Sequence, residues 1–272
     1  MKRIILLFFL LSLSIIVLLT KFCETDESCP IIECNSGTLN EKTCNCDCPD
    51  GFSGTNCETE DLCITNPIAC ENGGTPNADC TACDCPDGYI GTNCEDFDPT
   101  QVQSLLANHT PKELFDGGII LDSLYGKMYE GGIIFYLNTD NGTGMVAATS
   151  DQDMGSFAQW GCFGAVITGA DGKGLGMGAQ NTTDILTKCT EAGIAAKLCR
   201  DKGADWFLPS KDELNLMYTN LHANRHGGFA ADAYWSSTEH DDFNAWFQYF
   251  RSGFQNFDKK LEFYHVRAAR AF

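Results

Sequence analysis

The sequence predicts a multidomain protein in which two small, disulfide-rich modules precede an α+β domain. Thirteen of the sixteen cysteines lie before residue 95, a density typical of small secreted scaffolds that are stabilised by cross-links. A ten-residue string that begins and ends with cysteine occurs twice, at residues 48–57 and 85–94. After residue 128, several apolar runs of strand-like length accompany one helix-like segment. With 272 residues, the chain is long enough for more than one domain.

Residues 1–22 are predicted to be a signal peptide or a signal anchor. A basic start, Met1-Lys-Arg, precedes an apolar run from Ile4 to Leu19. This run is long for a signal-peptide core and short for a membrane span of about 20 residues. Cys23 follows, trailed by acidic residues, and resembles the lipidated first residue of a bacterial lipoprotein. Cleavage, lipidation of Cys23 and retention as an anchor therefore stay open.

Charge and cysteine usage indicate an exported protein. Residues 24–96 hold one Lys and sixteen acidic residues, and residues 97–272 hold fourteen Lys or Arg and twenty-one acidic residues. No basic stripe exists, so nucleic acid is not an expected partner. Disulfides persist only in an oxidising compartment. We expect the chain to be secreted, or to lie on the cell surface or the outer membrane, tethered to the membrane through its N-terminus.

Residues 29–57 and 63–94 form an internal repeat. Each repeat has six cysteines, with a Cys-x-Cys string and then eight residues before the last cysteine. Modules of about 30 residues cannot bury enough apolar surface to fold alone, so cross-links that restrict the unfolded chain must stabilise them. Six cysteines by themselves allow fifteen pairings.

This spacing resembles the EGF-like domain, and the resemblance implies a pairing of first to third, second to fourth and fifth to sixth cysteine. The implied pairs are Cys29–Cys44, Cys34–Cys46, Cys48–Cys57, Cys63–Cys80, Cys70–Cys83 and Cys85–Cys94. Some EGF-like domains bind calcium through acidic residues before the first cysteine. Glu60-Asp61-Leu62 matches that pattern only in part, and the first module has nothing close. We therefore expect no cofactor and a calcium-independent spacer, with calcium as the alternative.

Residues 98–127 are predicted to connect the repeats to the last domain. Val102, Leu105 and Leu106 have helical spacing, and Gly117-Gly118 interrupts the pattern. One or two short helices that pack on the next domain are expected here, rather than a free linker.

Residues 128–272, called the head below, are predicted to be α+β. Residues 131–137 and 144–148 are apolar runs that flank an Asn-Gly turn, which indicates a hairpin. A glycine-rich loop is expected up to Gly178, and helical segments are expected at residues 181–186 and 194–199. Four strands are expected at residues 233–238, 245–251, 254–258 and 263–269.

Residues 205–218 organise this domain. Trp206 to Leu208 is predicted to be a short strand that ends at Pro209. Ser210 and Glu213 form a capping box, in which each side chain satisfies the other residue's backbone N–H. Leu214 and Met217 then begin an apolar helix face that is expected to continue to residue 221.

Several short strings, in order, resemble one bacterial family. They are Trp160-Gly-Cys, Asn181-Thr-Thr, Ile194-Ala-Ala, Asp205-Trp-Phe-Leu-Pro-Ser-Lys-Asp-Glu-Leu, Tyr234-Trp-Ser-Ser-Thr-Glu, Ala245-Trp and Val266-Arg-Ala-Ala-Arg. Together they resemble the domain family named after the C-terminal domain of the Lcl collagen-like adhesin, over residues 112–272. The resemblance implies a fold of the C-type-lectin-like and formylglycine-generating-enzyme group. It also implies adhesion, with glycans among the candidate ligands.

The sequence favours a head that is not an enzyme. Cys162, Cys189 and Cys199 are expected to form one disulfide, and the sequence does not fix which pair bonds. The formylglycine-generating relatives use a cysteine pair near the C-terminus, whereas no cysteine follows Cys199 here. His222 and His226 have metal-ligand spacing but lack the glutamate of His-Glu-x-x-His. We therefore expect no metal site. The calcium-binding strings of C-type lectins are also absent.

The C-terminal strands are rich in aromatic residues, which bind sugar rings by stacking. The candidate ligand-binding residues are Trp246, Gln248, Glu239, Asn244 and Arg251, as an exposed patch. The alternative is that both faces of these strands are covered. Arg267 and Arg270 are expected to pair with Asp205 or Glu213.

The function expected from these features is that of a non-enzymatic bacterial surface protein, in which the EGF-like modules form a stalk. The head would then bind a glycan or a protein on a surface. The alternatives are a structural role in envelope or matrix assembly, and an enzyme on the same fold.

Overall fold

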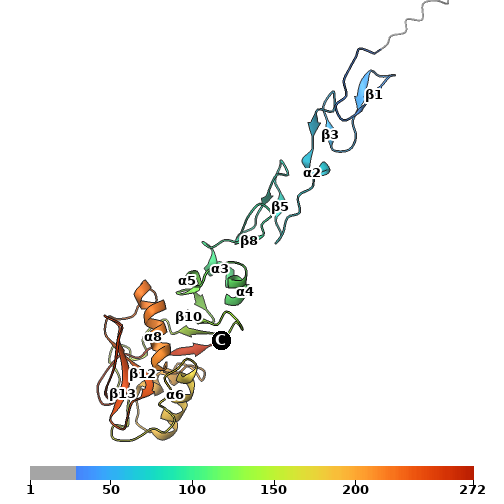
Figure 1. Cartoon of the computed structure of the whole chain (residues 1–272). Coiled ribbons are helices and arrows are strands. Elements are labelled where there is room, and N and C mark those ends of the chain that lie inside the picture. The colour runs from blue at the N-terminus through green and yellow to red at the C-terminus, as the bar shows by residue number, and fades with distance from the viewer. Residues whose placement is uncertain (1–28) are drawn as a thin grey trace, which may run out of the picture. The chain divides into compact units, whose positions relative to one another are not determined.

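A computed structural model describes residues 29–272 (Figure 1). The predicted signal segment at residues 1–22 and the lipidation candidate Cys23 lie outside the described residues. Within residues 29–272, no helix has both the length and the apolar character needed to cross a bilayer. The described chain forms two compact units, namely residues 29–70 with 75–84, and residues 71–74 with 85–272.

The first unit consists of short two-stranded sheets. β1 (Thr38–Asn40) pairs with β2 (Asn45–Asp47), β3 (Phe52–Ser53) with β4 (Thr59–Glu60), and β5 (Thr75–Pro76) with β6 (Cys83–Asp84), all antiparallel. A single helical turn, α2 (Leu62–Thr65), follows β4. The buried apolar side chains of this unit are cysteines: Cys57, Cys80 and Cys83. Cross-links therefore take the place of a hydrophobic core.

Six disulfides stabilise the cysteine-rich region. They join Cys29–Cys44, Cys34–Cys46, Cys48–Cys57, Cys63–Cys80, Cys70–Cys83 and Cys85–Cys94, the same partners that the EGF-like spacing implies. The sequence repeat is also a structural repeat. Phe52 pairs with Glu60 in the first module, and the equivalent Tyr89 pairs with Phe97 in the second. Cross-links of this number are typical of an extracellular or secreted protein.

A seventh disulfide lies in the head and joins Cys162 to Cys189, which leaves Cys199 free and buried in α7 (Ala195–Asp201). Burial raises the pKa of the Cys199 thiol well above its usual value. A buried, protonated thiol reacts slowly, because the thiolate is the nucleophile.

We therefore predict that a thiol reagent applied to folded protein will leave Cys199 unmodified. In denaturant without reductant, the reagent should modify Cys199 and no other cysteine among residues 29–272. Mass spectrometry of the labelled peptides measures both outcomes, and the peptide that contains Cys162 serves as the control. Rapid labelling of Cys199 in the folded protein would contradict its burial.

The second unit begins with the β7–β8 hairpin (Tyr89–Ile90 and Asp96–Phe97), which packs on the connector. The Tyr89 hydroxyl lies 3.2 Å from His109 Nε2, and the Phe97 ring contacts the same imidazole. The connector forms three short helices, α3 (Val102–Leu105), α4 (Pro111–Asp116) and α5 (Leu121–Leu124). Their apolar residues join the core of the head, so the connector packs on the head and has three short helices where one or two were expected.

The head has a mixed α/β architecture with two small antiparallel sheets. The four-stranded sheet has the order β15-β11-β10-β9, and the three-stranded sheet has the order β12-β13-β14. The strands of the first sheet are β9 (Met128–Tyr129), β10 (Gly132–Leu137), β11 (Gly144–Ala147) and β15 (Ala269–Ala271). Those of the second are β12 (Ala233–Glu239), β13 (Asn244–Tyr249) and β14 (Phe254–Lys259). The helices are α6 (Met177–Lys188), α7, α8 (Lys211–Asn220) and the 3-10 turn η1 (His222–Asn224).

Strand β10 divides two hydrophobic clusters. Successive side chains of a strand point to opposite faces, so Ile133 and Phe135 lie in one cluster whereas Ile134 lies in the other. Helix α8 contacts β10 of the first sheet and β12 and β13 of the second (Figure 1). Its Leu214 and Met217 are fully buried in the same cluster as Phe135. The helix is therefore the element that holds the two sheets together.

The capping box at the start of α8 is confirmed, and it has a second use. Glu213 is fully buried and accepts hydrogen bonds from the backbone N–H groups of Ser210 (2.8 Å) and Gly176 (2.7 Å). A Cβ on Gly178 would lie 2.3 Å from Glu213 Oε2 and 2.9 Å from the Leu208 carbonyl. Only glycine lets α6 approach so closely. Gly178 lies in the first turn of α6, which begins at Met177, whereas the glycine-rich loop was expected to extend to Gly178.

The expected strand at residues 263–269 is wrong. Tyr264 bridges to Ala158, His265 bridges to Tyr234, and only residues 269–271 form a strand, β15, beside β11. The segment crosses from one sheet to the other, so it cannot make a continuous ladder with either. The expected strand at Trp206–Leu208 is likewise reduced to a single bridge between Phe207 and Ala269.

The predicted partners of the two C-terminal arginines are also wrong. Arg267 pairs with Asp151 (2.7 Å), and Arg270 pairs with Glu130 (3.3 Å). Glu213 is already occupied by backbone donors, and the crossing of residues 264–268 turns Arg267 toward the segment that follows β11.

Candidate functional site

The expected exposed patch is not formed by its five residues. Glu239 and Gln248 are buried, whereas Arg251 is exposed and Asn244 and Trp246 are partly buried. Alternation along a strand predicts which residues share a face but not what covers that face. Helix α8 covers Gln248 on one face of the sheet, and the Ile167 segment contacts Glu239, which pairs with Ala245 on the other face, so both residues have structural roles.

Glu239 belongs to a buried ion pair. Its Oε1 lies 2.5 Å from Nζ of Lys260, which is fully buried, and also accepts a hydrogen bond from the Ile167 N–H (2.8 Å). The Lys260 ammonium also donates to the Ala165 carbonyl and lies 4.8 Å from the centre of the Trp160 ring. This pair anchors the residue 165–167 loop to β12.

Gln248 and Asn244 are also occupied by neighbouring groups. The Gln248 side-chain amide donates to Asn215 of α8 (2.8 Å) and to the Gly253 carbonyl (3.1 Å). The Asn244 amide donates to both carboxylate oxygens of Asp241, at 2.9 and 3.0 Å. Burial would raise the pKa of Asp241, but the hydrogen bonds from Asn244 and His240 outweigh it and hold that pKa well below its usual range. Both side chains therefore brace the sheet and its turns.

Trp246 has different neighbours, which form an aromatic group on one face of the sheet. It pairs with Phe257 across β13 and β14, with the ring centres 5.7 Å apart in an edge-to-face arrangement. The His240 ring stacks on Phe257 with its centre 3.8 Å away and 18° between the planes. Phe257 is 39 % exposed. An aromatic ring that is partly exposed to water and held by its neighbours can contact a flat apolar surface of a ligand.

Two lysines border this group. The Lys211 ammonium lies 4.8 Å and the Lys173 ammonium 5.5 Å from the centre of the Trp246 ring, within the range of a cation–π interaction. The Asp212 N–H donates to the Lys173 carbonyl (3.0 Å), and Ser210 Oγ donates to the Gly174 carbonyl (2.9 Å). These bonds attach the glycine-rich loop to the start of α8 and bring both lysines to one place. We call Trp246, Phe257, His240, Lys173 and Lys211 the aromatic–lysine platform.

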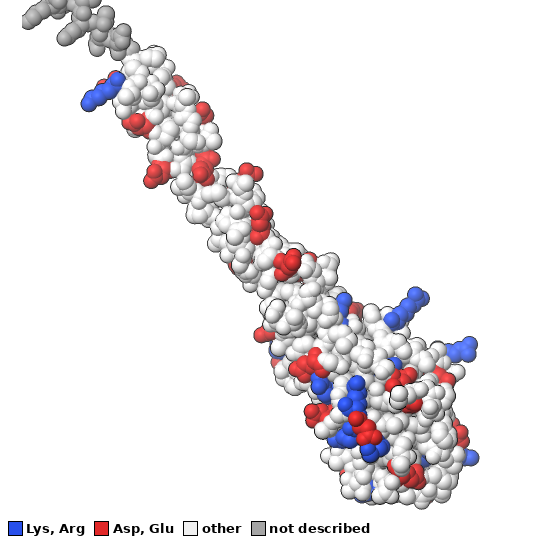
Figure 2. Space-filling model, turned by 180° about the vertical axis from the view of Figure 1, so that it is seen from behind, with Lys and Arg blue, Asp and Glu red and all other residues white. Residues whose placement is uncertain are grey.

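Acidic and basic side chains are unevenly distributed along the chain. On the face drawn in Figure 2, the charged side chains of the cysteine-rich region are mostly acidic, and most of the visible Lys and Arg side chains belong to the second unit.

The indole Nε1–H of Trp246 is buried without a partner in the described chain. An unsatisfied buried donor costs about 1–3 kcal/mol, so an acceptor that reached it would be favoured.

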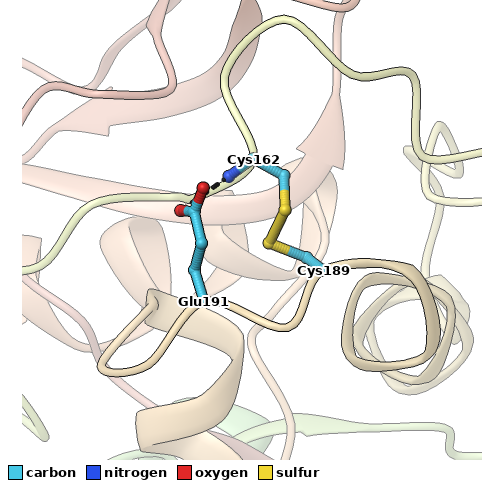
Figure 3. A group of neighbouring side chains, drawn as sticks. All are labelled: Cys162, Cys189 and Glu191. Atoms are coloured by element: carbon cyan, nitrogen blue, oxygen red, sulfur yellow. Dashed lines mark hydrogen bonds between the residues drawn. A yellow bond between two sulfur atoms is a disulfide. The ribbon is translucent and has the colours of Figure 1, made fainter.

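A second group combines Cys162, Cys189 and Glu191 (Figure 3). Its two sulfurs are bonded to each other, and the Glu191 carboxylate accepts a hydrogen bond from the Cys162 N–H (2.9 Å). Metal ligation needs thiolates, so the oxidised pair serves as a cross-link.

The two histidines with metal-ligand spacing have different surroundings. His222 stacks on Tyr218 and contacts Phe250, whereas His226 is exposed.

The sequence identified only one member of the platform, Trp246. Phe257 lies in one of the aromatic C-terminal strands, but His240, Lys173 and Lys211 come from the position directly after β12, a glycine-rich loop and the start of α8. No periodic signal links such positions.

Residues 128–272 form a mixed α/β head with an aromatic and cationic surface group, on a chain that also carries disulfide-rich modules. No protein-family model matches the chain, and a search of curated proteins finds no relative.

Proposed function

We propose that this protein is an exported, non-enzymatic surface protein whose head binds a glycan through the aromatic–lysine platform. The observation that carries the proposal is the exposed Phe257 ring, which stacks on His240 and contacts Trp246 edge-to-face, together with the Lys173 and Lys211 ammonium groups over the Trp246 ring. The apolar face of a sugar ring would stack on the aromatic group. The lysine ammonium groups would donate hydrogen bonds to sugar oxygens, because an ammonium has three donors and no acceptor.

The remaining parts of the chain fit this role. The two cysteine-rich modules would act as an EGF-like stalk, and the N-terminal segment, with or without lipidation of Cys23, would tether the protein to the membrane. The head would be of the C-type-lectin-like group that the Lcl resemblance implies. It would bind sugar without calcium, because the platform offers rings and ammonium groups rather than carboxylates.

A second function, in envelope or matrix assembly, is favoured by another surface feature. Phe163 and Phe243 contact each other edge-to-face at 5.2 Å, and both are exposed together with Val166. An exposed apolar group of this kind is typical of a protein–protein contact. In this role the head would bind a protein rather than a glycan.

We predict that Phe257→Ala weakens glycan binding about tenfold, which corresponds to about 1.4 kcal/mol of lost stacking. The protein without its first 22 residues would be screened on a glycan array, and the affinity for each binding glycan would be measured by calorimetry. Phe254→Ala is the matched control, because Phe254 lies on the opposite face of the same strand and is 60 % exposed. The glycan affinity of the Phe254→Ala variant should equal that of the unmodified protein.

Three outcomes would reject the platform as the site. They are equal losses in both variants, no loss in either, and no binding to any glycan. Failure to bind any glycan, combined with a specific loss of self-association in Phe243→Ala, would favour the assembly function instead.

A further inference from the structure

Asp151, Asp153 and His265 form a compact polar cluster that includes no residue of the aromatic–lysine platform. Each offers one oxygen or nitrogen ligand atom, and these atoms lie within 4.8 Å of one another. His265 Nδ1 is 2.8 Å from Asp153 Oδ2 and 3.6 Å from Asp151 Oδ2. Asp151 and Asp153 lie in the segment after β11, and His265 lies in the segment that crosses between the sheets. The three therefore join two irregular parts of the head.

One atom of the cluster lacks a partner. Asp153 is only 5 % exposed, and its Oδ1 is buried without a hydrogen-bond donor. The same carboxylate uses its other oxygen to contact His265. A buried carboxylate oxygen without a donor is unfavourable, because the group has lost its hydration and gained nothing in return. A cation held by both oxygens of this carboxylate would satisfy it.

The ligand groups are themselves held in place. Arg267 Nε donates to Asp151 Oδ1 (2.7 Å), and the Tyr234 hydroxyl donates to Asp151 Oδ2 (3.0 Å). The guanidinium is fixed in turn by the carbonyls of Ala148 and Gly227. Metal-binding carboxylates in proteins are commonly oriented by such outer hydrogen bonds. With a neutral imidazole, the two carboxylates and one guanidinium carry a net charge of −1, which attracts a cation.

We propose that Asp151, Asp153 and His265 bind a divalent transition-metal ion, of which zinc suits the ligands best. Imidazole nitrogen and carboxylate oxygen are both zinc ligands, whereas calcium prefers oxygen ligands alone. The proton of a neutral His265 ring moves from Nδ1 to Nε2 when Nδ1 takes the metal, so no net proton is lost. A bound ion replaces the direct His265–Asp153 hydrogen bond and cross-links residues 151–153 to residue 265.

This site could not be recognised in the sequence, because His265 lies 112 residues from Asp153 and no short motif joins them. The ion would act structurally, since it would stabilise the folded head and not the unfolded chain. By mass action, a concentration 100 times the dissociation constant would add about 2.7 kcal/mol to the unfolding free energy.

The test is a zinc titration of chelator-treated protein, followed by calorimetry and by the melting temperature. We expect one equivalent to bind and to raise the melting temperature. Asp153→Asn and His265→Gln should each weaken binding at least tenfold. His240→Gln is the matched control, because His240 Nδ1 also lies 2.8 Å from an aspartate, Asp241, but at a site without a third ligand. This variant should bind zinc like the unmodified protein.

A spectroscopic measurement keeps the proposal testable if a variant fails to fold. X-ray absorption at the zinc edge of the unmodified protein should show nitrogen and oxygen ligands and no sulfur. Sulfur ligation would place the ion at a cysteine and overturn the assignment. Absence of saturable zinc binding, binding of calcium alone, or loss of binding in His240→Gln with retention in Asp153→Asn would also overturn it.

Discussion

Glu213→Lys is expected to unfold the head. The carboxylate is fully buried and accepts the backbone N–H groups of Ser210 and Gly176, and its neighbour Gly178 leaves no space for a longer side chain. Charge reversal would leave these donors unsatisfied and bury an unpaired ammonium. Breaking a buried, hydrogen-bonded charge in this way costs about 3–5 kcal/mol, a large part of the 5–15 kcal/mol that stabilises a typical domain.

Tryptophan fluorescence during urea unfolding measures this effect, because all four tryptophans, Trp160, Trp206, Trp235 and Trp246, lie in the head. Asp212→Lys is the matched control. Asp212 is the preceding residue in the same first turn, but its side chain is 55 % exposed. It should cost less than about 1 kcal/mol. If Glu213→Lys unfolded no more easily than Asp212→Lys, the role given to Glu213 would be wrong.

The same residue predicts a pH dependence. Burial raises the pKa of Glu213 above its ordinary value of 4.5, against the lowering effect of the Ser210 and Gly176 N–H groups. The folded head therefore holds the proton more tightly than the unfolded chain does. The stability from this proton is complete below pH 4.5 and is lost as the pH rises through the raised, folded pKa. The side chain introduced by Glu213→Gln cannot titrate. As the pH rises through the folded pKa of Glu213, the unfolding free energy of the variant should therefore increase relative to that of the unmodified protein, as measured by urea unfolding at each pH.

The second large effect is expected at the ion pair of Glu239 and Lys260. Glu239→Gln would leave the fully buried Lys260 ammonium without its counter-charge, and we expect a loss of about 3–5 kcal/mol in the free energy of unfolding. Adding Lys260→Met should recover much of that loss, because a buried pair can be replaced by apolar groups at little cost. Urea unfolding of the single and double variants measures both.

The exposed pair of Lys197 and Asp201 is the control for that experiment. Its side chains are 48 % and 55 % exposed, and exposed ion pairs contribute about 0–1 kcal/mol. Lys197→Met should therefore change stability very little. A double variant at residues 239 and 260 that is less stable than Glu239→Gln alone would contradict the account of a buried, unpaired ammonium.

The parts of this fold that are set by local sequence could be predicted. The Ser210–Glu213 capping box depends on residues three positions apart, and the hairpin of β10 and β11 depends on a short Asn-Gly turn. The connector helices also follow their local spacing. In each case the interacting groups are close in the chain, so propensity and packing favour the same structure.

Contacts between distant segments could not be predicted. Arg267 pairs with Asp151, which lies 116 residues earlier, and nothing in either neighbourhood indicates the other. The prediction that the five candidate ligand-binding residues form one exposed patch was wrong for a related reason. The alternation of β13 shows that Trp246 and Gln248 share a face, but only the placement of α8 determines that Gln248 is covered. The expected strand at residues 263–269 was wrong because those residues serve two sheets.

The pairing of β15 with β11 has a consequence for the order in which the parts of the protein fold. Residues 269–271 complete a sheet that begins at Met128, so the four-stranded sheet cannot close before those residues have been delivered. The disulfides of the cysteine-rich modules, by contrast, join residues only 9–17 positions apart. Each module can therefore form its disulfides as soon as it enters an oxidising environment, while the four-stranded sheet stays open until residues 269–271 are in place. Contacts of long sequence separation form slowly, which makes the unfinished head the form of this protein that most needs chaperone protection.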